Sequence, residues 1–371
     1  MMIVAGEASG DAQAARLVAA MAAADSSLRF YGVAGEQMKA AGVEALACTS
    51  ELSIMGLGEV LSGLRRVLGT WRKLRKELVG DGKPDLLVLV DFPDFNLRLA
   101  RVAARNQVPV FYYVSPQVWA WRKRRIKSIA RRVDRMVVLF PFEVDLYAEV
   151  GLDAHYVGHP LAETVKADRD RKQTRERYGL STDKQLVALL PGSRVKEVEE
   201  LLPVMLEAAR CLSDKVEFVV ARAPGLPVEL LESLLAQSGL DVPVVEGDTY
   251  NLVAAADAVA LSSGTATVEC AVLGCPMVVM YRVTRFTYAI VKRLIKVPWI
   301  AMPNILLDRE AVPELVQGQV TAEALAARLA PLLEEGQLRS DMKRDLASVS
   351  DMLVKPGAAG RAAALAVEMI A

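Results

Sequence analysis

The feature that most constrains the fold is a regular alternation of short β-rich runs with helical stretches along all 371 residues. Six strand-like runs precede residue 161, and five more follow residue 184. Strands that alternate with helices are typical of parallel sheets covered by helices on both faces. We therefore predict an α/β protein built of doubly wound parallel sheets.

A polar, charge-dense stretch, "LAETVKADRDRKQTRERYGLSTDK", separates the two sets of strands. A chain of this length is too long for one hydrophobic core, so two domains are expected. We predict two Rossmann-like domains facing across a cleft, because such sheets bind ligands beyond the carboxyl ends of their strands. The predicted parts are a first domain over residues 1–163, a linker over 164–184, a second domain over 185–350, and a C-terminal helix over 351–371 that packs back on the first domain.

Charge and composition exclude several classes of protein. Lys and Arg equal Asp and Glu at 45 each, so the net charge indicates no polyanionic partner. Four scattered cysteines are typical of reduced thiols, and two histidines are too few for a histidine-rich metal site. The chain opens as a strand rather than a signal peptide, and no apolar run reaches the ~18 residues of a membrane span. We expect a cytoplasmic protein whose membrane contact, if it has one, is peripheral.

Two turns in the second half have features of phosphate sites. In "ALSSGTATVE", a strand ends at Gly264 and Thr265 and a helix follows at once, so free backbone N–H groups would favour a phosphate. Glu269, about one turn later, could accept hydrogen bonds from ribose hydroxyls. In "ALLPGSRVKEVEELLP", Ser193 and Arg194 stand at a similar turn, and a cation at a helix N-terminus suggests a nearby anion. The alternative for each turn is an ordinary capped helix.

Neither turn matches the Walker pattern or the spaced glycines of a dinucleotide fingerprint. A pyrophosphate held without these motifs fits a nucleotide-sugar better than ATP or NAD.

The first half offers a candidate general base. "LVLVDFPDFN" puts Asp91 at the carboxyl end of an apolar strand, where a carboxylate can accept a proton. Asp91 or Asp94 could equally cap the helix that follows, and physical reasoning on the sequence does not separate the two. A second polar turn, "AGEASGD", carries Glu7, Ser9 and Asp11.

Basic residues concentrate in one part of this half. Residues 60–135 carry 18 basic and 6 acidic side chains, which indicates a local anionic contact. Trp119 and Trp121 interleave with part of this basic run, as in proteins that stack on single-stranded nucleic acid. The alternative is a solvated helix with buried tryptophans.

A set of motifs, in order along the chain, closely resembles the lipid-A-disaccharide synthase family. The motifs are "AGEASGD", "GVAGEQM", "MGLGEVL", "DFPDFN", "YYVSPQVWAWR", "LLPGSR", "SSGTATVE" and "MPNILLDREAVPEL". The resemblance implies a GT-B glycosyltransferase fold without a metal or cofactor. It also implies inverting transfer of 2,3-diacylglucosamine from UDP-2,3-diacylglucosamine to 2,3-diacylglucosamine 1-phosphate (lipid X), which forms a β-1,6 disaccharide and UDP.

The resemblance also assigns roles to residues. The family's essential aspartate falls on Asp91, its diphosphate-contacting arginine on Arg194, and its UDP-contacting asparagine on Asn304. The expected UDP-sugar site comprises Ser193, Arg194, Gly264, Thr265, Glu269 and Asn304, and the expected acceptor side comprises Glu7, Ser9 and Asp11. Alternatives are a UDP-sugar epimerase or another UDP-sugar transferase of the same fold. A nucleic-acid-binding protein is a further alternative, but the phosphate-type turns argue against it, and we expect no nucleic acid partner.

The stretch "VLSGLRRVLGTWRKLRKEL" carries an apolar stripe at helical spacing with cations on both sides. Most such stripes face a core, but this pattern is also typical of a helix that lies in a membrane interface. Because both implied substrates carry acyl chains, we predict that this helix contacts the anionic cytoplasmic face of the inner membrane. The predicted membrane-contacting residues are Val60, Leu61, Leu64, Arg65, Val67 and Leu68.

Overall fold

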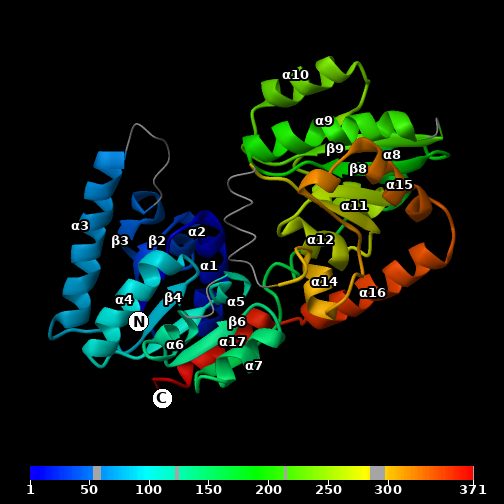
Figure 1. Ribbon diagram of the computed structural model, residues 1–371. Helices are drawn as coiled ribbons and strands as arrows, with labels where there is room; N and C mark the ends of the chain where they lie inside the picture. Colours follow the sequence, from blue (N-terminus) through cyan, green and yellow to red (C-terminus); the bar gives the residue numbers. More distant parts are fainter. Residues whose placement is uncertain (53–59, 122–124, 213–214, 285–296, 371) are drawn as a thin grey trace. The chain divides into compact units, whose positions relative to one another are not determined.

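The chain folds into two compact units in the computed structural model (Figure 1). Unit 1 comprises Met1–Pro160 and Lys355–Ala371, and unit 2 comprises Leu161–Val354. The structure describes residues 1–52, 60–121, 125–212, 215–284 and 297–370. Each unit is built around a wholly parallel sheet, so the predicted α/β class is confirmed.

Unit 1 contains a seven-stranded sheet in the order β3-β2-β1-β4-β5-β6-β7. Its strands are β1 Met2–Ala5, β2 Tyr31–Ala34, β3 Glu44–Cys48, β4 Leu87–Val90, β5 Val110–Tyr113, β6 Arg135–Val138 and β7 Asp153–Tyr156. Its helices are α1 Ala8–Ala24, α2 Glu36–Ala40, the 3₁₀ helix η1 Thr49–Glu51, α3 Val60–Val79, α4 Pro93–Arg105, α5 Val118–Trp121, α6 Ile126–Ala130, α7 Phe142–Ala148 and α17 Ala358–Val367.

The two faces of this sheet carry separate hydrophobic clusters because neighbouring residues of a strand point to opposite sides. Along β1, Met2 and Val4 belong to one cluster, and Ile3 and Ala5 to the other. The first cluster includes residues of α3, α4, α6 and α7, and the second includes residues of α1, α2 and α17. Helices therefore cover both faces, as a doubly wound sheet requires.

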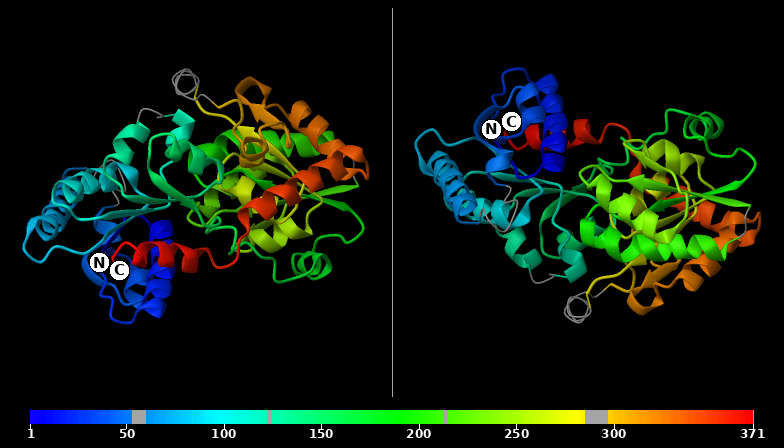
Figure 2. Two further views of the ribbon diagram at one scale, coloured as in Figure 1. Left: turned by 90° about the horizontal axis from the view of Figure 1, so that it is seen from below. Right: turned by 90° about the horizontal axis from the view of Figure 1, so that it is seen from above.

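The C-terminal helix α17 packs against α1 in unit 1 (Figure 2). Its small buried face, which includes Ala362 and Ala366, lies in the same cluster as Leu17 and Met21 of α1. Arg135 of β6 fixes the end of the helix by donating hydrogen bonds to the Leu365 carbonyl and the Glu368 carboxylate. The far C-terminus is thus part of the N-terminal unit.

Unit 2 contains a six-stranded sheet in the order β10-β9-β8-β11-β12-β13. Its strands are β8 Gln185–Leu190, β9 Val216–Arg222, β10 Val244–Glu246, β11 Ala258–Ser262, β12 Met277–Tyr281 and β13 Glu314–Val316. Its helices are α8 Arg171–Arg177, α9 Val195–Cys211, α10 Val228–Ser238, α11 Thr249–Ala255, α12 Ala266–Val272, α14 Met302–Leu307, the 3₁₀ helix η3 Gln317–Gln319, α15 Ala322–Leu333 and α16 Gln337–Leu353. Helix α9 packs against α10 and α15, and α16 packs against α12 and α14.

The strand order reverses at one point in each sheet. In unit 1 the chain leaves the central pair β1–β4 in opposite directions, and in unit 2 it leaves β8–β11 in the same way. The loops that follow these four strands therefore diverge, and doubly wound sheets bind ligands in the crevice beside such a point. We therefore expect ligand-binding residues on these loops.

The predicted linker over residues 164–184 is wrong, because this segment belongs to unit 2 and contains α8. Helix α8 packs against α11. Arg175 is 1% exposed and donates to the carbonyls of Ala255, Ser181 and Lys184 and to the Asp257 carboxylate. The many charged residues of this segment suggested a solvated linker. The charge of Arg175 is instead satisfied by partners inside unit 2. The division between the units lies at residues 160–161, and α16 keeps residues 351–354 in unit 2.

Replacing Arg175 with leucine should lower the free energy of unfolding of the protein by about 3 kcal/mol, because breaking a buried ion pair leaves polar groups without partners. The control is Arg177→Leu on the same helix, because Arg177 is exposed. Chemical denaturation measures both variants. Equal stability of the two would show that Arg175 does not hold α8 in place.

Candidate functional site

In unit 1, the two loops at the strand-order reversal carry Glu7, after β1, and Asp91, after β4. Asp91 is half-buried, and burial is the main cause that raises the pKa of its carboxyl above the ordinary aspartate value. The negative charge of Glu7 raises the same pKa further, so the two carboxylates are electrostatically coupled. A carboxyl in this environment is suited to accept a proton.

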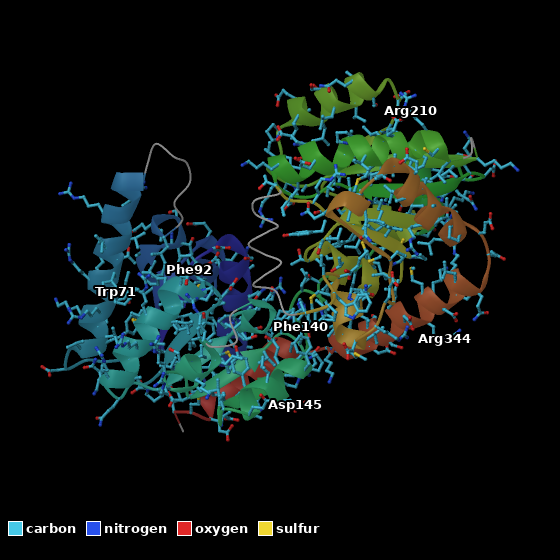
Figure 3. The ribbon with its side chains drawn as sticks, in the orientation of Figure 1. Trp71, Phe92, Phe140, Asp145, Arg210 and Arg344 are labelled. Atoms are coloured by element: carbon cyan, nitrogen blue, oxygen red, sulfur yellow. The ribbon has the colours of Figure 1, made fainter. Side chains whose placement is uncertain are left out.

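Asp91 and its neighbour Phe92 both have left-handed backbone conformations, with φ of 48° and 45°. The Phe92 ring lies over Gly6, where a Cβ atom would come within 2.3 Å of the ring. Only glycine therefore fits at position 6 without displacing the loop that carries Asp91. Figure 3 shows Phe92 in unit 1.

Asp94 has a different environment from Asp91. It lies in the first turn of α4, its side chain is 73% exposed, and it pairs with Arg125 at 3.0 Å. An exposed, ion-paired carboxylate is a poorer candidate for a general base than the half-buried Asp91. The structure thus gives a physical distinction between two aspartates that physical reasoning on the sequence left equivalent.

The predicted acceptor-side residue Asp11 is instead structural. It is 5% exposed, and its carboxylate accepts hydrogen bonds from the backbone N–H groups of Gly35, Gln37 and Met38 at the start of α2. The carboxylate therefore satisfies the unpaired donors of a helix N-terminus. Glu7 and Ser9 are exposed at the beginning of α1.

A group of buried polar residues that the sequence did not reveal lies at the carboxyl ends of β5, β6 and β7. Glu143 is fully buried, accepts a hydrogen bond from the Ser115 hydroxyl at 2.7 Å, and also accepts from the amides of Leu139 and Phe140. Burial raises the pKa of Glu143 to about 7. His159 follows β7 in the chain, and burial lowers the pKa of its imidazole to about 4. No role was predicted for these residues, because nothing in a single sequence marks an acid as buried.

Trp119 belongs to an aromatic cluster beside this group. It is 5% exposed and makes edge-to-face contacts with Phe142 and Phe140, at centroid distances of 5.2 and 6.4 Å. An indole packed in this way offers no face for a nucleic acid base, which disfavours the stacking interpretation of Trp119. The side chain of Trp121 lies outside the described residues.

In unit 2, the loop after β8 carries Ser193 and Arg194 at the start of α9. Both are exposed, and Glu197 joins them by accepting from the Ser193 amide at 3.1 Å and from the Arg194 guanidinium at 2.5 Å. Gly192 has a φ of 127°, and a Cβ there would lie 2.5 Å from the Glu197 carboxylate. This close approach explains the glycine. Arg194 retains further N–H donors because a guanidinium has five.

The second loop at this point, after β11, carries Gly264 and Thr265 immediately before α12. Both residues are exposed, and no atom lies within 4 Å of the position of a Gly264 Cβ. Glu269, in the first turn of α12, is half-buried and accepts a hydrogen bond from the Tyr250 hydroxyl at 3.2 Å. The predicted residues of the two turns thus follow the two central strands of one sheet, at the same edge.

The side chain of Asn304, the residue that the resemblance assigns to UDP contact, makes its hydrogen bonds within unit 2. Its side chain is fully buried, and both its donors and its acceptor are occupied by protein groups. Its amide nitrogen donates to Val312 and Glu314, and its amide oxygen accepts from the amides of Ala311 and Val312. These four hydrogen bonds hold the carboxamide in place, and contact of this residue with UDP stays a prediction. Asn304 instead ties α14 to the start of β13.

The apolar stripe of α3 is partly a core face. Leu74 and Leu78 are fully buried, and Trp71, labelled on α3 in Figure 3, lies near this face. The Trp71 ring meets Phe95 of α4 edge-to-face at a centroid distance of 5.6 Å. Val67 is partly buried and packs against the same cluster. Leu68 is 43% exposed and Arg65 is exposed, whereas the predicted side chains of Val60, Leu61 and Leu64 lie outside the described residues.

No helix in the described ranges is both long enough and apolar enough to cross a membrane. Within the same ranges, His, Cys, Asp and Glu side chains form no group of three or more that could hold a metal ion.

Each unit contains a parallel sheet whose strand order reverses at one point. Solved structures also contain two such units. A putative UDP-N-acetylglucosamine 2-epimerase from Listeria monocytogenes is 16% identical and has a TM-score of 0.65, over 97% of this chain and 93% of that chain. MurG from Acinetobacter baumannii is 15% identical and has a TM-score of 0.58, over 99% of each chain. These likenesses show the GT-B fold of glycosyltransferases and UDP-sugar epimerases.

Sequence comparison identifies the family within this class. Residues 1–364 match the family model described as lipid-A-disaccharide synthetase. The lipid-A-disaccharide synthase of Syntrophus aciditrophicus is 45% identical over 374 residues, which cover all of this chain and 97% of the relative. That of Myxococcus xanthus is 43% identical over 373 residues, with the same coverage. The chain belongs to the lipid-A-disaccharide synthase family and is a glycosyltransferase of lipid A biosynthesis.

Proposed function

We propose that the protein transfers 2,3-diacylglucosamine from UDP-2,3-diacylglucosamine to the 6-hydroxyl of lipid X. Asp91 removes the hydroxyl proton, the oxygen attacks the anomeric carbon from the side opposite UDP, and the bond between that carbon and the UDP oxygen breaks. The products are the β-1,6-linked disaccharide 1-phosphate and UDP, which leaves with the bonding electron pair. The half-buried Asp91 carboxyl beside the strand-order reversal is the observation that carries this proposal.

The environment of Asp91 supports the role of a base. Its pKa is raised by burial and by Glu7, so its carboxylate binds a proton more readily than an exposed aspartate does. General-base catalysis typically contributes about 10²–10⁴-fold to a rate. Asp94, which is exposed and paired with Arg125, is the matched control.

The unit 2 residues would hold the departing UDP. Arg194 and the backbone at Gly264 and Thr265 would face the diphosphate, with Ser193 beside them, and Glu269 would accept hydrogen bonds from the ribose. Negative charge grows on the leaving group in the transition state, so a guanidinium and fixed N–H donors lower the barrier. An epimerase function, the alternative, has only the shared fold in its favour.

The substrates carry acyl chains, and we propose that α3 contacts the anionic cytoplasmic face of the inner membrane. Leu68 would enter the interface, and the exposed cations Arg65, Arg72 and Lys73 would meet lipid phosphates. Each such cation contributes ~1 kcal/mol near an anionic surface.

Asp91→Asn should reduce kcat by about 10²–10⁴-fold, because the amide keeps the shape of the side chain but cannot accept the proton. UDP release from the diacylated donor in the presence of lipid X measures the rate. In the wild type, kcat should rise with pH through a pKa above the ordinary aspartate value, since the ionised carboxylate is the active form. If Asp94→Asn abolishes turnover and Asp91→Asn does not, the base is Asp94.

Arg194→Ala should lower kcat strongly and weaken UDP binding, because it removes positive charge from the leaving-group site. Arg210→Ala is the control, since Arg210 is an exposed arginine in the last turn of the same helix (Figure 3). Excess chelator should leave wild-type turnover unchanged. Inactivation by chelator that a divalent ion reverses would contradict a metal-free reaction.

Leu68→Ser should weaken binding to vesicles that contain anionic lipid by about fivefold, which corresponds to ~1 kcal/mol of apolar burial. Val79→Ser is the control, because Val79 is 53% exposed at the C-terminal end of α3. Sedimentation with vesicles measures binding, and the thermal midpoint of both variants should match that of the wild type. Unchanged binding of Leu68→Ser would remove α3 from the membrane contact.

A further inference from the structure

The backbone at Asp91 adopts an unusual conformation. Six non-glycine residues in the described ranges have positive φ, and of these only Asp91 and Phe92 are neighbours in the chain. A left-handed conformation costs a residue other than glycine about 1–2 kcal/mol. Such a conformation persists only where surrounding contacts fix it, so the contacts of this peptide should explain how the carboxylate is presented.

Two buried donors hold the carbonyl oxygen of Asp91. The Tyr112 hydroxyl donates to it at 2.6 Å, and the Asn96 side-chain amide donates at 2.8 Å. The amide of Asp91 donates to the Tyr113 carbonyl at 3.2 Å, which continues the pairing of β4 with β5. The main chain of Asp91 is therefore fixed on both sides, with only its side chain left to interact elsewhere.

Tyr112 stands among apolar residues. It is fully buried in the cluster that contains Leu87 and Leu89, and it pairs with Leu89 across the sheet. A phenylalanine would fill nearly the same space, so packing alone does not require the hydroxyl. A buried phenol needs a hydrogen-bond partner, and its partner here is the Asp91 carbonyl. Burial raises the pKa of Tyr112 well above its ordinary value, so the hydroxyl remains a donor.

We propose that Tyr112 is a positioning residue for Asp91, whose carbonyl it holds so that the left-handed peptide directs the carboxylate toward the acceptor hydroxyl. This inference rests on the proposed role of Asp91 as the base. Tyr112 does not touch substrate in this scheme. Its contribution passes entirely through the orientation of Asp91.

The expected effect follows from the geometry of proton transfer. A general base must lie within about 2.6–3.2 Å of the atom whose proton it takes, and a displacement of 1 Å can reduce a rate by about 10²-fold. Without the Tyr112 hydroxyl, Asn96 is the one remaining side-chain donor of the pair, and the carboxylate becomes less well oriented. The binding of UDP-sugar and of lipid X should change little, because neither uses Tyr112.

The test compares Tyr112→Phe with Tyr147→Phe. Tyr147 is a fully buried tyrosine of the same cluster, and its hydroxyl donates to the Pro116 carbonyl instead. We expect Tyr112→Phe to lower kcat by about ten- to a hundredfold with both KM values within about twofold of wild type. Tyr147→Phe should leave kcat within about twofold. Thermal unfolding of both variants checks that the fold is retained.

A second comparison separates positioning from a general structural effect. Adding Tyr112→Phe to Asp91→Asn should change kcat by less than about twofold, because a residue that acts through Asp91 loses its effect when the base is absent. An equal loss in the wild-type and Asp91→Asn backgrounds would show that Tyr112 acts independently of the carboxylate and would overturn the inference. So would a Tyr112→Phe variant as active as Tyr147→Phe.

The two proposals fail in different ways. If Asp91→Asn retains near-normal turnover, the base assignment fails, and the role of Tyr112 fails with it. If Asp91→Asn is inactive while Tyr112→Phe keeps the wild-type kcat, Asp91 remains the base and Tyr112 is an ordinary core residue.

Discussion

The parallel pairing of β1 with β4 in unit 1, repeated by β8 with β11 in unit 2, is the constraint on which the rest of the structure depends. The chain reverses its direction of winding at each pair, so the loops after the two strands part from each other. Asp91 and Glu7 stand on these loops in unit 1, and Arg194 and Gly264 stand on them in unit 2. Each group of candidate residues is thus positioned by hydrogen bonds between buried strands rather than by the loops themselves.

The loop that carries Asp91 shows how a packed interior presents a reactive group. Phe92 fits over the bare backbone of Gly6, and Tyr112 and Asn96 hold the Asp91 carbonyl from inside the unit. The free energy cost of two left-handed residues is met by these contacts, which are buried or partly buried. Rigidity at this position is useful because a base is effective only at hydrogen-bond distance from its proton.

Two residues that were predicted to lie at ligand sites make hydrogen bonds inside the protein. Asp11 and Asn304 both lie in motifs typical of the family, yet each saturates backbone groups of a neighbouring segment. Arg175 was assigned to a linker and is instead the buried centre of a polar network in unit 2. A polar residue type states which hydrogen bonds it can make, whereas its burial decides whether a ligand or the protein itself receives them.

The sequence alone determined the α/β class, the two sheets and the turns that carry Asp91, Arg194 and Gly264, because strand and helix periodicity and glycine-rich turns are local properties of a chain. It also carried the family, through motifs spread over most of its length. Only the tertiary structure showed that Asp91 is half-buried while Asp94 is exposed and ion-paired, that Glu143 is buried, and that Val67 packs against the core cluster. These outcomes depend on what lies across the fold from each side chain, and contacts between distant segments set burial, desolvation and hydrogen-bond partners.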